Sequence, residues 1–396
     1  MKTIFEKLGY TVSETKTCVF NEEIELLVIL NRDKSIRYAW PANLNKALFV
    51  KFRGSKSFIN ILLSLGCKFI FLLGLQKLFF TKKSLYVKEK SKETELANRY
   101  SLWTLFVRKS NSIEKALLYT IINGKGSFTK VATQPHSIEL IRNESMVLDL
   151  LNESRIRNFV IPNTINVGQC SVEMDDISQN GTILNEYCNI HTMALSELNE
   201  LTAYLTPLNE LKSWRELKED LFQLMKLDDS RLPKNLLYML SQMIEKTNEC
   251  KPIEVCLSHG DFTAENMFEK DMKLHIFDWE LSNVIKPMGF DAFHFIIQQG
   301  LLVNKSNWKT IRKEIDKKIN CSTFETLSKF HKGNLEQHLQ FYLVYTCVNY
   351  LKLHVEHSVN PMETNHSLKT WKEALTEMLN INQAQPELDE NSVYAF

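Results

Sequence analysis

The sequence lacks three features that would place it in a special class. Lys plus Arg (48) nearly equals Asp plus Glu (47), so the net charge of +1 offers no general attraction for nucleic acid. None of the eight cysteines forms a C-x-x-C pair, which excludes the usual zinc pattern. A chain of 396 residues has no need of a disulfide framework. We therefore expect reduced thiols and a cytoplasmic protein.

We also expect no secretory leader, because MKTIFEKLGYTV has no apolar core followed by a cleavage site. One apolar run, residues 58–80, is long enough to reach across a bilayer, but Lys68 falls near its middle and Gln76 and Lys77 follow. A buried or amphipathic helix is favoured. Peripheral membrane contact stays open because basic residues flank the run at both ends, and a true span is the least favoured alternative.

The hydrophobic pattern changes character along the chain. Residues 102–132 hold apolar stretches joined by short polar turns, among them NGKGS, as in an antiparallel meander. A helical period follows from residue 135, and after residue 191 the pattern is mainly helical to about residue 380. The order predicts a strand-rich lobe followed by a helical lobe, and thus an α+β fold.

The polar residues of LSHGDFTAENMFEKDMKLHIFDWE, residues 257–280, carry the candidate chemistry. Asp261 and Asn266 have the D-x-x-x-x-N spacing of a phosphotransferase catalytic loop, in which the Asp orients an attacking hydroxyl and the Asn reaches a magnesium ion. A hairpin over the next residues would bring Asp278 to the same ion. Amide and carboxylate oxygens suit Mg²⁺. The alternative is a polar surface loop.

The segments HGDFTAEN, IFDWE and PMGFDAFHF together resemble the aminoglycoside phosphotransferase and choline kinase-like family. The resemblance covers about two thirds of the chain and implies a two-lobed protein-kinase-like fold with an additional N-terminal region. It also implies that His259 and Asp291 support the catalytic loop. Glu280 is assigned to substrate placement, to ordering of the metal site or to a structural hydrogen bond, and His294 to the core.

A phosphotransferase needs a cation for the nucleotide phosphates, and Lys130 in FTKVATQP lies on a predicted strand in a setting similar to V-A-I-K. Glu144 follows on the next predicted helix, where the family keeps the carboxylate that pairs this lysine. Glu153 is a weaker candidate for that carboxylate. The segment TILNEYCNI resembles a kinase hinge, which implies that the Glu186 carbonyl and the Cys188 amide bind adenine.

Two departures from protein kinases favour a small substrate. The turn KSNSIEK has no glycine, so no Gly-rich flap covers the phosphates, and no A-P-E segment follows Asp278 to dock a peptide. The predicted segments are an N-terminal extension (1–98) with an apolar helix (58–80), an N-lobe with hinge (99–190), a helical C-lobe with the catalytic loop (191–382) and a flexible tail (383–396).

The predicted activity is that of a small-molecule kinase, which transfers the γ-phosphoryl group of ATP or GTP to a hydroxyl with the help of Mg²⁺. The acceptor would be a sugar, an amino alcohol or an aminoglycoside-like molecule. A faint resemblance of IRYAWPANLNKALFVKFRGSKSF to the leader region of family members linked to surface-polysaccharide genes favours sugars. The alternative is a non-catalytic, kinase-like nucleotide-binding module that acts at a membrane or in surface-polysaccharide assembly.

Overall fold

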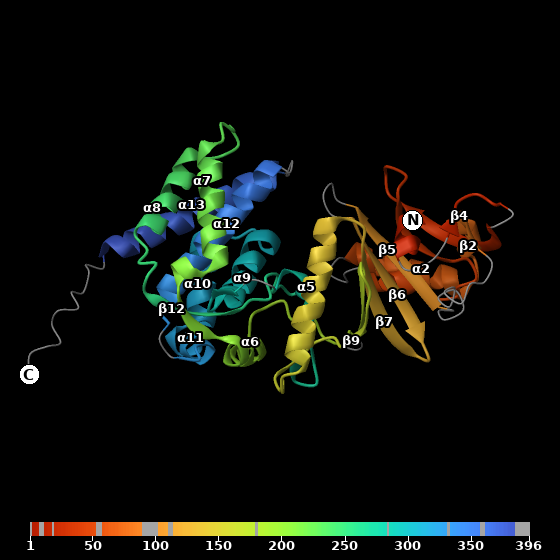
Figure 1. Cartoon of the computed structure of the whole chain (residues 1–396), viewed down its shortest axis with the longest axis horizontal. Helices are drawn as coiled ribbons and strands as arrows, with labels where there is room; N and C mark the ends of the chain where they lie inside the picture. The colour runs from red at the N-terminus through yellow and green to blue at the C-terminus, as the bar shows by residue number, and fades with distance from the viewer. Residues whose placement is uncertain are drawn as a thin grey trace, which may run out of the picture. The chain divides into compact units, whose positions relative to one another are not determined.

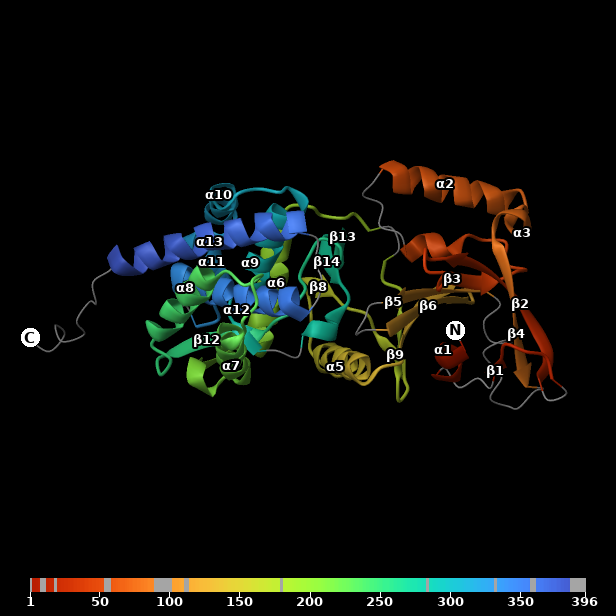
Figure 2. The same ribbon diagram turned by 90° about the horizontal axis from the view of Figure 1, so that it is seen from above.

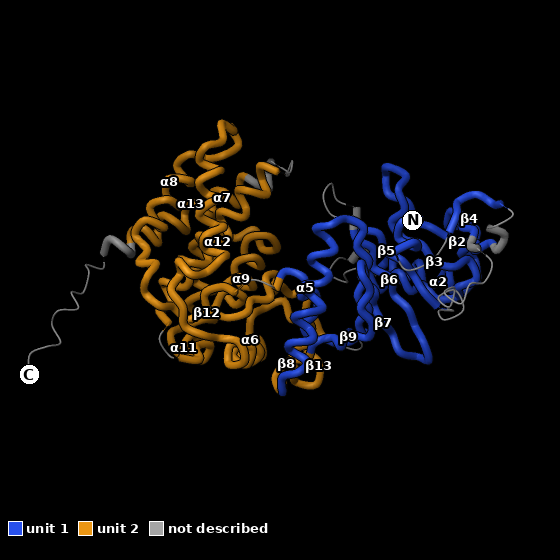
Figure 3. Tube along the Cα trace, viewed as in Figure 1, with its two compact units in different colours: residues 1–155, 161–181, 276–281 blue, residues 156–160, 182–275, 282–396 orange. Residues whose placement is uncertain are grey.

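The computed structural model divides into two compact units. Unit 1 comprises residues 1–155, 161–181 and 276–281, and unit 2 comprises residues 156–160, 182–275 and 282–396 (Figure 3). Each unit is treated by itself below. The residues that the structure describes are 2–7, 12–17, 20–52, 58–88, 102–109, 114–178, 181–282, 285–330, 333–356 and 361–384.

Unit 1 is built on one sheet, which has nine strands among the described residues, and neighbouring strands are antiparallel (Figure 1). In spatial order the strands are β1 (Val12–Ser13), β4 (Thr81–Lys88), β2 (Phe20–Leu30), β3 (Ile36–Pro41), β5 (Leu102–Lys109), β6 (Glu114–Ile122), β7 (Lys125–Ala132), β10 (Ser171–Asp175) and β9 (Thr164–Val167).

The meander β5–β6–β7 follows from its sequence. Asn123 and Gly124 join β6 to β7 with φ values of 50° and 78°, as a tight hairpin requires, and asparagine and glycine tolerate this conformation best. Along β7 the side chains alternate between more and less buried positions, because successive residues of a strand point to opposite faces. This alternation sets the direction of Lys130.

Hydrophobic clusters cover both faces of the sheet. On one face, Ile4 and Phe5 of α1 (Lys2–Lys7) pack with residues such as Leu26 and Leu105. On the other face, Phe49 of η1 (Leu48–Phe52) and Phe71 of α2 (Phe58–Leu72) pack with Trp40 and its neighbours. The sheet therefore forms the centre of the unit 1 core.

The predicted N-terminal extension contributes to this same sheet. Strand β3 pairs with β5, with Tyr38 opposite Phe106, so strands from both sides of residue 98 are joined by hydrogen bonds. The expected single helix over residues 58–80 is replaced by α2 and the short α3 (Gln76–Phe79), and β4 begins at Thr81. Gly74, with φ of 68°, lies at the break between the helices.

Helix α5 (Pro135–Asn152) completes unit 1. Pro135 occupies its first turn, where proline's fixed φ fits and no backbone N–H is lost to the helix. Ile141, Leu148 and Leu151 share its buried side with Glu144. A carboxylate on the apolar side of a helix needs a partner, and the functional site below provides it.

Unit 2 is mainly helical, with two small sheets, β11–β12–β15 and β13–β14–β8. Helix α12 is apolar on most sides and contacts α7, α8, α9 and α13, which places it at the centre of this unit (Figure 2). The helices are α6 (Asn189–Thr202), α7 (Lys212–Lys226), α8 (Lys234–Glu245), α9 (Phe290–Gln298), α10 (Trp308–Lys318), α11 (Cys321–Leu327), α12 (Leu335–Glu356) and α13 (Pro361–Ala384). The strands are β8 (Phe159–Val160), β11 (Tyr204–Pro207), β12 (Pro252–Leu257), β13 (Met267–Lys270), β14 (Lys273–Ile276) and β15 (Ile285–Pro287). Short 3₁₀ or π turns lie at η2 (Leu208–Glu210) and η4 (Gln299–Val303) in this unit, whereas the turn η3 (Trp279–Leu281) belongs to unit 1.

The predicted α+β fold class is confirmed by this division into a sheet-based unit and a helical unit. None of the seven cysteines within the described residues forms a disulfide. In the part of the chain that the structure describes, every helix is too short or too polar to cross a lipid bilayer.

The stability of unit 2 should fall at mildly acidic pH because of His338. Burial lowers the pKa of this histidine to about 4, and its Nδ1 lies 2.9 Å from the carbonyl oxygen of Met288. The unfolded chain, with a histidine pKa near 6.5, binds the proton more readily, so stability is full above that value and is lost as the pH falls. Between pH 6.5 and 5 we expect a loss of about 2 kcal/mol from this group.

Urea unfolding at several pH values measures this loss. His338→Gln should reduce the pH dependence between about pH 6.5 and 5, while the buried His191, whose pKa burial also lowers to about 4, keeps its own contribution. The exposed His136 provides the control, since His136→Gln should leave the dependence as it is. An unchanged slope in His338→Gln would contradict the prediction.

Candidate functional site

Lys130 lies at the centre of a cluster of charged side chains in unit 1. It belongs to β7, opposite Leu117 of β6 and Val172 of β10, and its side chain is 15% exposed. Its Nζ lies 2.6 and 2.8 Å from the two carboxylate oxygens of Glu144. Both oxygens of one carboxylate thus contact the ammonium group, which fixes the direction of the long lysine side chain.

Glu144 is fully buried and binds both the lysine and the backbone of the turn η3. Its Oε1 also accepts a hydrogen bond from the backbone N–H of Trp279 at 3.1 Å. The carboxylate therefore connects β7, α5 and the turn η3, which lies over a hundred residues later in the chain. Glu153 instead forms the C-terminal cap of α5. The sequence analysis favoured Glu144 over Glu153 as the partner of Lys130, and in the structure Glu144 contacts Lys130.

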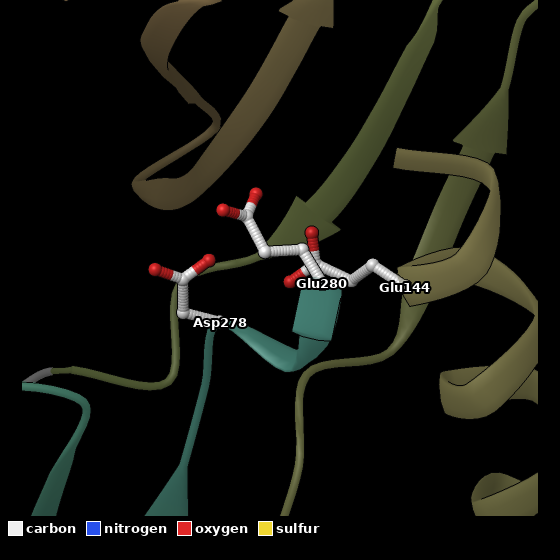
Figure 4. Close-up of side chains that lie close together, drawn as sticks. All are labelled: Glu144, Asp278 and Glu280. Atoms are coloured by element: carbon white, nitrogen blue, oxygen red, sulfur yellow. The ribbon is translucent and has the colours of Figure 1, made fainter. Parts of the chain in front are cut away.

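Asp278 and Glu280 complete the group (Figure 4). Asp278 has a left-handed backbone, with φ of 69°, and its carboxylate contacts the Lys130 ammonium. Glu280 lies 3.7 Å from Lys130 and 2.7 Å from Lys115, and its backbone oxygen accepts from the Asn143 amide at 3.0 Å. Two lysines thus face the three carboxylates, so most of the charge is neutralised within the cluster.

The charges of this cluster favour a protonated lysine. Burial acts to lower the pKa of Lys130, but the carboxylates around it outweigh burial, with Asp278 and then Glu144 the stronger, and its net pKa lies above the ordinary value. Lys130 is therefore an ammonium at neutral pH. Such a fixed positive charge on a sheet suits the phosphates of a nucleotide.

The oxygen atoms of this group also include a candidate metal ligand. One oxygen each from Glu144, Asp278 and Glu280 lies within 4.8 Å of the others. Glu144 is buried and already accepts from Lys130 and the Trp279 amide, whereas the Asp278 side chain is 36% exposed. Asp278 is consequently the carboxylate of the three that is best able to accept a hard cation such as Mg²⁺.

In unit 2, Asp291 organises the predicted catalytic loop. It lies in the first turn of α9, and its oxygens accept from the Ser258 hydroxyl at 2.8 Å and from the backbone N–H groups of His259 and Gly260 at 2.7 and 3.2 Å. Gly260 has φ of 84°, a conformation that favours glycine. One buried carboxylate thus holds three successive residues of the loop.

Asp261 and Asn266 lie next to each other at the end of this loop. The Asn266 side-chain amide donates to the Asp261 backbone oxygen and to its Oδ2, both at 2.9 Å. These two bonds use the N–H groups of the amide, so Oδ1 is the atom left to accept a cation. The donor chemistry of Asn266 therefore fits a magnesium ligand.

His294 is a residue of this site that the sequence analysis missed, since it was assigned to the core. Its Nε2 lies 3.6 Å from Asp261 Oδ1, and its Nδ1 lies 3.3 Å from the Tyr342 hydroxyl. The contact with His294, more than any other, lowers the pKa of Asp261 below its ordinary value, although burial acts against it. The sequence contained a signal: His294 follows Asp291 by three residues, so both point from one side of α9 to the loop.

His259 lies inside the loop and not at its surface. It is fully buried, its Nδ1 accepts from the Asp261 N–H at 3.3 Å, and its ring contacts Phe262. These contacts are those of a residue that maintains the conformation of the loop. The supporting role inferred for His259 stays a prediction that agrees with its position.

The predicted hinge residues have other contacts in the structure. The Cys188 N–H donates to His191 Nδ1 at 3.1 Å as part of the cap of α6, so adenine would have to displace that bond. The Glu186 side chain is exposed and lies 3.4 Å from Lys318. Most of the glycine-free turn KSNSIEK, residues 110–113, lies outside the described residues.

Replacement of Asp291 tests the organisation of the loop. In Asp291→Asn one oxygen becomes a donor that faces the backbone N–H groups, and the acceptor loses its charge. We expect a loss of about 3 kcal/mol in stability, together with faster hydrogen exchange of the amides of residues 258–261.

The control for this variant is Asp228→Asn, because Asp228 is an exposed carboxylate of the same unit. Thermal unfolding and hydrogen-exchange mass spectrometry measure both effects. If Asp291→Asn matched Asp228→Asn in stability and exchange, Asp291 would not organise the loop.

Comparison with known proteins identifies the fold. No family model matches the chain, and no curated protein matches it. Among solved structures, a Ralstonia eutropha protein provisionally described as an aminoglycoside phosphotransferase superposes with a TM-score of 0.50 at 12% identity, over 74% of this chain and 97% of that one. Choline kinase LicA from Streptococcus pneumoniae gives a TM-score of 0.48 at 12% identity, over 72% and 97% of the two chains. The predicted resemblance is thus confirmed at the level of the fold: this chain has the protein-kinase-like fold of the aminoglycoside phosphotransferases.

Proposed function

We propose that this protein is a phosphotransferase that transfers the γ-phosphoryl group of ATP or GTP to a hydroxyl group of a small molecule. The observation that carries the proposal is the position of Lys130, which is held by the buried Glu144 and contacts Asp278. A purely structural ion pair needs only one lysine and one carboxylate, whereas Lys130 contacts two carboxylates. A lysine that is fixed by one carboxylate and also contacts a second, partly exposed one is typical of a nucleotide site.

The residues of the loop in unit 2 orient the acceptor hydroxyl and remove its proton. Asp261 accepts the hydroxyl proton as the acceptor oxygen forms its bond to the γ-phosphorus, and the bond from that phosphorus to the β-γ bridging oxygen breaks. The lowered pKa of Asp261 keeps it ionised and able to accept that proton. Asn266 and His294 fix the carboxylate in direction.

The residues of unit 1 bind the nucleotide phosphates. Lys130 neutralises phosphate charge and Glu144 keeps the lysine extended. Asp278 has the oxygen donors to hold Mg²⁺, and so has Asn266 of unit 2. The ion would supply charge neutralisation on the phosphates. Positioning and fixed charge are the main sources of rate in such a reaction.

The acceptor is proposed to be small because the chain between Asp278 and α9 is short. Among its described residues it contains only the turn η3 and the three-residue strand β15 before α9 begins at Phe290. A protein kinase uses a longer segment there to dock a peptide. Sugars, amino alcohols and aminoglycoside-like molecules are the classes to test.

Asp261→Asn tests the proton acceptor. It should retain the fold and Mg·ATP binding but lose about 10²–10⁴-fold in kcat, because the amide cannot accept the proton. Coupled assays of ADP release with a panel of sugars, amino alcohols and aminoglycosides measure turnover. Asp228→Asn is the control, and a fully active Asp261→Asn would refute the assigned role.

Asp278→Ala tests the nucleotide half of the proposal. This variant should lose most of the thermal stabilisation that Mg·ATP gives to the parent protein, because stabilisation follows ligand affinity. Asp149, an exposed carboxylate of α5, provides the control Asp149→Ala. If the parent showed neither Mg·ATP stabilisation nor turnover with any acceptor, the proposed activity would fail as a whole.

A further inference from the structure

Unit 1 exposes an unusual number of large apolar side chains on α2 and α3. Of the 26 large apolar side chains that are strongly exposed among the described residues, eight fall within an 18-residue stretch. We call these eight the α2–α3 face. They are Leu62, Leu63, Leu65, Phe69, Leu72, Leu73, Leu78 and Phe79, and their exposed fractions run from 50% to 80%.

Helix α2 is attached to the sheet by its other side. Phe71 is 4% exposed, and its ring centroid lies 5.9 Å from that of Trp40 and 6.0 Å from that of Phe49. Figure 2 shows α2 along the outside of the strands of unit 1, with α3 at its end. The helix thus has a buried anchor and an opposite side of leucine and phenylalanine in solvent. Exposed apolar patches of this kind mark binding surfaces.

The sequence that carries the face is rich in positive charge. From residue 34 to residue 88 the sequence contains no Asp or Glu and has eleven Lys or Arg residues. Glu25, outside that stretch, lies 3.3 Å from Lys77 and 3.2 Å from Lys82. Lys68 and Lys83 are also exposed. The apolar face therefore lies within a cationic rim, which is complementary to an anionic partner.

We propose that the α2–α3 face is a docking surface for an anionic lipid bilayer. Apolar side chains enter the boundary between headgroups and acyl chains, while the lysines meet the anionic headgroups, and these two contributions together give stable attachment. With 15 residues, α2 is about 22 Å long. It is therefore shorter than the roughly 30 Å hydrocarbon core and lies along the surface.

The composition favours a bilayer over a protein partner. Interfaces between proteins are enriched in Tyr, Trp, Phe, Met and Arg and depleted in Lys. The α2–α3 face has two Phe but no Tyr, Trp, Met or Arg, and the charged residues of α2, α3 and β4 are all lysines. A second copy of the chain is also disfavoured, because pairing of two such faces would bring Lys68 and Lys83 close to their counterparts. The proposal is independent of the phosphotransferase activity.

Vesicle flotation of the full chain tests the proposal. We expect the protein to float with vesicles of phosphatidylglycerol and phosphatidylcholine, to float weakly with phosphatidylcholine alone, and to lose binding as salt screens the lysines. Leu65→Gln/Phe69→Gln/Leu72→Gln should lower the partition coefficient about tenfold or more. Lys68→Glu/Lys83→Glu should lower binding to anionic vesicles while leaving the weak binding to neutral vesicles unchanged.

The matched control is Phe222→Gln/Met225→Gln/Leu227→Gln, which removes one phenylalanine and two aliphatic side chains that are 46–55% exposed in unit 2. This control should float as the parent does. Thermal unfolding verifies that each triple variant is folded. The proposal fails if the parent does not float with anionic vesicles at low salt, or if both triple variants lower flotation equally. It also fails if sedimentation without lipid shows a dimer that the α2–α3 variant abolishes, since a second copy would then occupy the face.

Discussion

The buried ion pair of Lys130 and Glu144 is the interaction on which unit 1 is organised. Glu144 is on the apolar side of α5, where an unpaired carboxylate would be strongly unfavourable, and loss of one partner from such a pair typically costs about 3–5 kcal/mol. Because the same carboxylate binds the Trp279 N–H, the pair also fixes the turn that carries Asp278 and Glu280. Helix α5, strand β7 and a turn over a hundred residues later are thereby held by one side chain.

Unit 2 has the same kind of device in Asp291. Here a buried carboxylate accepts from two backbone N–H groups and one hydroxyl, and no basic side chain is among these three donors. The reason is the shape of the loop: Gly260 has a left-handed backbone, and the amides before Asp261 point inward and must be satisfied. In unit 1 the buried Glu144 determines the position of Lys130, which is proposed to contact the phosphates. In unit 2 the buried Asp291 determines the position of the loop that carries Asp261, which is proposed to contact the acceptor.

The sequence predicted the parts of the fold that local chemistry determines. The spacing of Asp261 and Asn266 specifies a loop, and the Asn-Gly pair specifies the hairpin before Lys130. It did not predict that β3 pairs with β5, because alternation assigns a face to each residue but does not name the neighbouring strand. It also missed His294, since an isolated histidine on an apolar helix has the same pattern whether it fills the core or faces a carboxylate.

That unpredicted pairing gives the N-terminal region a physical role. Strands β3, β5, β6 and β7 are consecutive in one hydrogen-bonded sheet, so Trp40, which packs with the Phe71 anchor of α2, and Lys130 belong to the same framework. Twisted sheets of this size resist bending because every ladder hydrogen bond opposes it. A bilayer bound to the α2–α3 face would therefore fix the orientation of Lys130 relative to the membrane plane. A nucleotide site has no intrinsic need for four added strands, whereas an enzyme that meets its acceptor at a surface needs a rigid connection of this kind.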